Sequence, residues 1–247
     1  MQILKNKILI SVGDSINLQL IKSLKNEIPN WTAKTWEFLG LDNDQQLCGN
    51  VKEYAPTMFH NKNHNITLIH IWHGNPLHNS WNSKRHSCPL IQHNAAEILE
   101  KMIEYKWFGE DYIFFTDVGV HLAVFNPIVI YKRLVDFNRT VEKYLQAHPE
   151  NMEKATVIYK GMVFNRGRLI DVYSTVSSTI MKRIQEIAEY IFDKGSVIVF
   201  DFWQMTEVVF DHQKVGEVHP GRGIGSSKWI MLGIRDRFLD LLGMILD

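Results

Sequence analysis

The chain has 247 residues and no formal net charge, because Lys+Arg and Asp+Glu each number 27. Hydrophobic residues make up 45% and charged residues 22%, which is ordinary for a globular protein and argues against a disordered chain. The balanced charge argues against a nucleic-acid-binding surface, and two cysteines are too few for a disulfide framework.

The chain alternates between short apolar runs and amphipathic stretches. Residues 7–12 (KILISV) are typical of a buried strand, and 15–28 have the apolar spacing of a helix. Further strands are expected at 65–74, 111–119, 155–161 and 196–202, followed respectively by helices at 95–107, 127–147, about 170–194 and about 226–246, the last capped by Ser226. Residues 1–247 therefore predict a single α/β domain, a three-layer, doubly wound, mostly parallel five-stranded sheet.

In such sheets, ligands bind at the carboxyl ends of the strands. The residues expected at these ends are Gly13-Asp14-Ser15, His73-Gly74-Asn75-Pro76, the segment from Asp117 to His121, Lys160 and Asp201, with Glu217-Val218-His219-Pro220 in the loop after the last strand.

Ser15 is the first candidate for chemistry. A serine hydroxyl attacks a carbonyl only when a base takes its proton, and a strand-to-helix turn exposes the hydroxyl beside backbone N–H groups. Gly-Asp-Ser after a strand is also a common turn, in which serine serves as a helix N-cap. From the residues alone, both interpretations stay open.

His219 is the candidate base, in the Gly-rich stretch EVHPGRGIG. The loop after the last strand can reach a serine on the first one, although a solvent-exposed loop histidine would look the same. Gly74 and Gly119 end two middle strands, where glycine lets backbone N–H groups approach a substrate. A plain turn explains each glycine equally well.

Together these blocks resemble the SGNH (GDSL-type) hydrolases, and more closely the C-terminal PC-esterase-like domain of the NXPE (neurexophilin and PC-esterase) family. The similarity spans roughly residues 8 to 245. It is carried by VGDSINLQ (12–19), WHGNPL (72–77), DVGVHLAVFNPIVIYKRL (117–134), ATVIYKGMVFN (155–165), VFDFWQMTEV (199–208) and VHPG (218–221).

The resemblance implies cleavage or transfer of O-acyl groups, usually acetyl, on carbohydrate hydroxyls. It assigns Ser15 as the nucleophile and His219 as the base, and it treats Asp14 as structural. Gly74 and the segment from Gly119 to His121 would line the oxyanion hole together with the Ser15 N–H. Trp203 is expected to stack on a sugar ring, although core packing is the alternative for such an aromatic.

The chain departs from the resembled pattern at two positions. Gly216 stands three residues before His219, where SGNH enzymes carry an aspartate, so Asp201 is the first candidate for the orienting acid and Glu217 the second. Leu18 replaces an arginine that the family usually carries. These departures sustain an alternative function, a catalytically weakened glycan-binding or protein-interaction module.

The remaining expectations concern ligands and compartment. We expect no metal and no cofactor, apart from an acyl donor such as acetyl-CoA if the reaction is a transfer. The expected partner is a glycan or another O-acylated small substrate, with no nucleic acid and no membrane span. The absence of a signal peptide favours the cytoplasm, and an excised domain of a secretory-pathway protein is the alternative.

Overall fold

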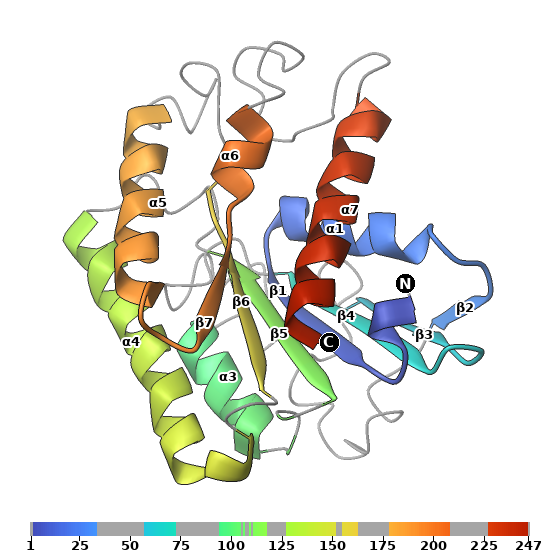
Figure 1. Cartoon of the computed structure of the whole chain (residues 1–247), viewed down its shortest axis with the longest axis horizontal. Coiled ribbons are helices and arrows are strands. Elements are labelled where there is room, and N and C mark those ends of the chain that lie inside the picture. Colours follow the sequence, from blue (N-terminus) through green and yellow to red (C-terminus); the bar gives the residue numbers. More distant parts are fainter. Residues whose placement is uncertain are drawn as a thin grey trace, which may run out of the picture.

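The computed structural model describes residues 2–33, 57–72, 94–104, 106, 109, 111–117, 127–151, 155–162, 178–207 and 227–246. Within them lies one seven-stranded sheet in the order β2-β3-β4-β1-β5-β6-β7 (Figure 1). The parallel strands are β4 (Ile66–Trp72), β1 (Ile8–Gly13), β5 (Tyr112–Asp117), β6 (Thr156–Lys160) and β7 (Val197–Phe200).

The five predicted strands are confirmed, but the sheet is larger than predicted. β3 (Thr57–Asn61) pairs antiparallel with β4, and β2 (Trp31–Ala33) pairs antiparallel with β3. Both extra strands extend the sheet on the β4 side. The five parallel strands stay next to one another in the order β4-β1-β5-β6-β7.

Helices cover both faces of the sheet, which confirms the three-layer architecture (Figure 1). On one face lie α1 (Ser15–Lys25) and α7 (Ser227–Leu246), and on the other lie α3 (Ala95–Glu104), α4 (Pro127–Ala147) and α5 (Ser178–Phe192). The short α6 (Phe202–Glu207) follows β7, and the 3-10 turns are η1 (Gln2–Leu4) and η5 (Pro149–Asn151).

Ring contacts fix which strand positions face which layer. Phe115 of β5 packs against Phe238 of α7 at 5.0 Å between ring centroids, whereas its neighbour Phe114 packs against Phe137 of α4 at 6.1 Å. Successive residues of a strand point to opposite faces. The residues paired with Phe115, including Ser11 of β1, therefore share the α1/α7 face.

Local chemistry explains where the helices begin and end. Asn94 and Glu97 exchange hydrogen bonds of 3.0 and 3.1 Å between side chain and backbone N–H, a capping box that begins α3. α3 ends at Glu104, before the predicted limit at residue 107. Lys106, just beyond this end, has a positive φ of 60°. Ser226, the predicted cap of α7, lies outside the described residues.

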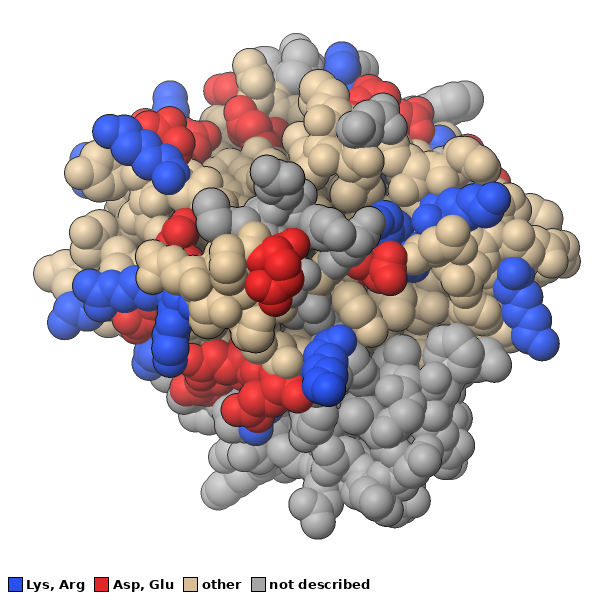
Figure 2. Space-filling view, turned by 60° about the horizontal axis from the view of Figure 1, so that its bottom comes forward, with Lys and Arg blue, Asp and Glu red and all other residues tan. Residues whose placement is uncertain are grey.

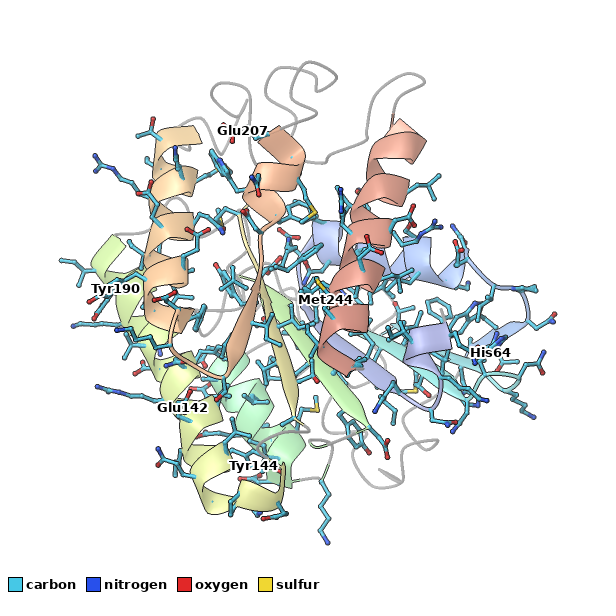
Figure 3. The ribbon with its side chains drawn as sticks, in the orientation of Figure 1. His64, Glu142, Tyr144, Tyr190, Glu207 and Met244 are labelled. Atoms are coloured by element: carbon cyan, nitrogen blue, oxygen red, sulfur yellow. The ribbon has the colours of Figure 1, made fainter. Side chains whose placement is uncertain are left out.

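The strand order reverses at β1, which pairs with β4 on one side and β5 on the other. In doubly wound sheets the ligand crevice lies outside the carboxyl ends of the strands at this switch point. That edge is at the top of Figure 1, where α1 and α6 begin. Figure 3 shows Glu207, the last residue of α6, at this edge, whereas Tyr144 of α4 lies toward the opposite one.

The described surface carries both signs of charge. Figure 2 shows Lys and Arg interspersed with Asp and Glu on the face it presents, without a continuous field of one sign. Among the described helices, none combines the length and apolar character that crossing a bilayer needs.

Candidate functional site at the carboxyl edge of the sheet

The turn from β1 into α1 is built around Asp14. This residue has extended backbone angles (φ −83°, ψ −163°), and its Oδ1 accepts a hydrogen bond from the Ile16 N–H at 2.8 Å. Asp14, with 2% of its surface exposed, is therefore the N-cap of α1, and Ser15 is the first residue of the helix. The interpretation of Ser15 as an N-cap is wrong, and the structural role expected for Asp14 is confirmed.

Gly13 lets α1 begin directly against the sheet. A Cβ atom at Gly13 would collide with the side chain of Asn17, which is fully buried and lies 3.5 Å from the Val12 carbonyl oxygen. A residue larger than glycine would push the first turn of α1 away from β1. The backbone of Ser15 is thus held at the switch point, in the first turn of α1 at the positive end of the helix dipole.

A second serine, Ser11, lies four residues before Ser15, within β1. Ser11 Oγ is 3.2 Å from His70 Nδ1 of β4, and both side chains are buried. Desolvation lowers the pKa of His70 to about 3, the nearby Asp14 carboxylate opposes this, and Lys22 and Lys160 add to it. His70 is therefore neutral near pH 7, and because neither side chain is more than 1% exposed, we interpret this Ser–His pair as structural.

The ends of β5 and β6 carry a buried ion pair that the sequence analysis did not assign. Asp117 and Lys160 face each other in register on the α1/α7 face, with Nζ 2.7 Å from Oδ2 and 3% or less of either residue exposed. The Lys160 ammonium also lies 4.9 Å from the ring centroid of Phe202. Opposite charges at the ends of two adjacent predicted strands were the signal available in the sequence.

Asp201 and Trp203 lie at the same edge, after β7. The Oδ1 atom of Asp201 accepts a hydrogen bond from the Gln204 N–H at 3.0 Å, so this carboxylate caps α6. Its second oxygen retains acceptor capacity. Trp203 is 7% exposed and belongs to the hydrophobic core, a burial that favours packing over stacking on a sugar.

The structure brings the turn of Ser15 and the carboxylate of Asp201 to one edge, with β5 and β6 between them. The other predicted site residues, Gly74, Gly119, His121 and His219, lie outside the described residues, as do Gly216 and Glu217. Within the described ranges, no group of three or more His, Cys, Asp or Glu side chains could hold a metal ion.

Comparison with known protein families identifies one whose model matches most of the chain. The sequence matches the family described as "NXPE family member 4-like, C-terminal domain" over residues 1–232. No curated protein matches it.

Among solved structures, the acetylxylan esterase Axe2 from Geobacillus stearothermophilus is 13% identical, with a TM-score of 0.44, over 98% of this chain and 97% of that one. An arginine-to-alanine mutant of Axe2, described as an acetyl-xylooligosaccharide esterase, is 11% identical, with a TM-score of 0.45 and the same coverage. At these TM-scores neither likeness carries weight, and the fold rests on the strand order.

Proposed function

This chain belongs to the NXPE family, matching its member 4-like C-terminal domain, and from that membership we propose that it is an O-acyl ester enzyme acting on carbohydrate hydroxyls. The observation that carries the proposal is the place of Ser15 in the fold. It opens α1 at the switch point, and Asp14 does the capping that would otherwise occupy a serine there.

The proposed reaction has two halves. His219 takes the proton of the Ser15 hydroxyl while Oγ attacks the acyl carbonyl, and the tetrahedral intermediate collapses as His219 returns the proton to the departing sugar oxygen. Water or a second sugar hydroxyl then attacks acyl-Ser15 with the same proton transfers in reverse order. The Ser15 N–H, Gly74 and the segment from Gly119 to His121 are the proposed oxyanion donors.

Asp201 is the first candidate to orient His219. The ends of β1 and β7 are three strand spacings apart, roughly 14 Å, and the proposal requires the Ser15 and Asp201 side chains to reach toward each other with the His219 imidazole between them. Asp201 Oδ1 is engaged in capping α6, which leaves Oδ2 for an imidazole N–H. Glu217 remains the second candidate because it is near His219 in sequence.

Hydrolysis and transfer share the acyl-serine intermediate and differ in the acceptor. An esterase takes the acyl group from a sugar ester and passes it to water. A transferase loads Ser15 from a donor such as acetyl-CoA, whose thiol leaves with the proton from His219, and passes the acyl group to a sugar hydroxyl. Acetyl is the proposed acyl group in either case. Trp203 is proposed to flank the sugar only through the small part of its surface that is exposed.

Labelling with a fluorophosphonate tests the proposal, because the probe reacts with an activated serine. We expect wild-type protein to be labelled at neutral pH, with the label lost in Ser15→Ala and His219→Ala. Ser11→Ala is the matched control: it should keep the label, because Ser11 is buried in β1.

Absence of labelling in a folded wild-type protein would contradict the enzyme and favour the non-catalytic alternative. That alternative is a glycan-binding or protein-interaction module, and Leu18 and Gly216 favour it because the resembled family carries an arginine and SGNH enzymes an aspartate at these positions. It would be supported further if glycan binding survived in Ser15→Ala.

A further inference from the structure

The Asp117–Lys160 pair is costly where it stands. Both side chains are buried, and burying a charged group costs free energy of desolvation that is recovered only when the ion pair is close and well hydrogen-bonded. A buried ion pair is weak evidence for stability, since apolar side chains of similar volume often serve as well. Its position at the candidate edge suggests a reason other than stability.

We propose that Lys160 is a positioning residue of the site, one side chain that holds two of its segments in fixed relation. Through Asp117 it fixes the end of β5, and through the ring of Phe202 it fixes the start of α6. The inference rests on the proposed acyl-ester function. It assigns to Lys160 a role exerted through Asp117 and Phe202.

The first contact leads to the proposed oxyanion segment. Asp117 is the last residue of β5, which pairs with β1, the strand that ends at the Ser15 turn. Gly119 follows Asp117 by two residues in the sequence. A carboxylate held at 2.7 Å by a buried ammonium fixes the point from which that segment departs.

The second contact leads to the proposed acid. Phe202 is the first residue of α6 and stands between Asp201 and Trp203 in the sequence. It is 1% exposed, so its ring is packed as well as contacted by the ammonium. A shift of this ring would carry the Asp201 carboxylate with it.

The two residues that follow Lys160 are anchored through their backbone N–H groups. The Gly161 N–H donates to the Phe200 carbonyl at 2.9 Å, and the Met162 N–H donates to Gln185 Oε1 of α5 at 2.8 Å. Gly161 leaves no room for a Cβ beside Gln185. The ammonium therefore extends from a fixed strand end, as a positioning group requires.

Kinetics of 4-nitrophenyl acetate hydrolysis by the full chain test this role. Lys160→Met alone leaves the Asp117 carboxylate buried without its cation and is expected to unfold readily, so the informative variant is Lys160→Met with Asp117→Asn. We expect this double variant to fold with a Tm near that of the wild type. Its kcat should fall at least tenfold while KM changes less than twofold, because misplaced groups slow chemistry more than binding.

Two further variants separate the effect of the Lys160 contacts from the effect of losing any lysine that lies over an aromatic ring. Phe202→Leu keeps the ion pair and should lower kcat by a smaller factor, about threefold. Lys25→Met is the matched control, because Lys25 Nζ lies 4.0 Å from the Phe59 ring centroid, at the other end of α1 from Ser15. It should leave kcat unchanged.

The outcomes distinguish this inference from the proposed function. A folded double variant with wild-type kcat would overturn the positioning role while the enzyme stands. An equal fall in kcat for Lys25→Met would also overturn it. A wild-type chain that neither labels nor turns over ester would overturn both.

Discussion

Two serines four residues apart in the chain show how position decides chemistry. Ser11 lies inside β1, fully buried and 3.2 Å from a histidine whose pKa burial lowers to about 3. Ser15 lies just past the end of the same strand, at the first residue of α1. A Ser–His pair within the sheet is therefore a structural contact, whereas Ser15, which we propose to pair with His219, belongs to the turn at the carboxyl edge of the sheet.

The same contrast extends across the α1/α7 face of the sheet. Toward the amino ends of the strands this face is apolar, with residues such as Leu9 and Ile113 fully or nearly fully buried. Toward the carboxyl ends it carries Ser11, His70, Asp117 and Lys160, with less than 4% of any of them exposed. Buried polar groups are retained where they are paired, and here they underlie the edge that we propose as the site.

The largest expected effect separates the two serines by activity. Ser15→Ala should lower kcat for 4-nitrophenyl acetate by about 10³ or more, because the nucleophile is lost. Ser11→Ala should keep kcat within a few-fold but lower the free energy of unfolding by about 1–3 kcal/mol, since His70 loses its partner. Reversed results would mean that the chemistry had been assigned to the wrong serine.

Gly13 tests how tightly the reactive turn sits on the sheet. Gly13→Ala should lower the free energy of unfolding by about 1–3 kcal/mol, because the new methyl group meets the Asn17 side chain. Combining it with Asn17→Ala should recover part of that loss. Urea unfolding of the double-mutant cycle measures the coupling, and purely additive losses would show that the two residues do not press on each other.

Acid titration tests the burial of His70. Because the pKa of His70 is lowered from 6.5 to about 3 in the folded state, the unfolded chain takes up this proton first as pH falls. Above about pH 6.5 His70 is neutral in both states and does not lower the free energy of unfolding. Between about pH 6.5 and pH 3 the free energy of unfolding falls by about 1.4 kcal/mol per pH unit, because only the unfolded chain binds the proton. Unfolding free energies at pH 6, 5 and 4 should fall more steeply for wild type than for His70→Gln. Parallel curves would show that His70 does not titrate in this way.

The smallest expected effect concerns the cap of α1. Asp14→Ala should lower the free energy of unfolding by about 1 kcal/mol, because the Ile16 N–H loses its acceptor. Asp14→Asn retains an acceptor and should lose only a small part of this, as measured by thermal unfolding. Equal losses in the two variants would point to the charge of Asp14, not its capping bond, as what matters.

The parallel sheet was predictable because its strands are continuous apolar runs. β2 and β3 were missed for the opposite reason: β2 has three residues, two of them exposed, and β3 carries polar residues such as His60 and Asn61. α6 has only six residues, too few to show a helical period.

The candidate site was predictable as an edge but not as a set of contacts. The position of Ser15 followed from the strand-to-helix turn. The sequence left open whether Ser15 is a nucleophile or the N-cap of the helix, and only the structure shows that Asp14 is the cap. Asp117 and Lys160 were recognised as strand ends, but their pairing depends on strand register. Register and burial arise from tertiary structure, so the sequence did not reveal that Lys160 also reaches Phe202.

A crystal structure of the protein trapped with a fluorophosphonate tests the central claim most directly. We expect the phosphorus to be bonded to Ser15 Oγ. A nitrogen of the His219 imidazole should lie within about 3.2 Å of Ser15 Oγ or of an oxygen on the phosphorus. An adduct on another residue, or His219 at the opposite edge of the sheet from the modified serine, would contradict it.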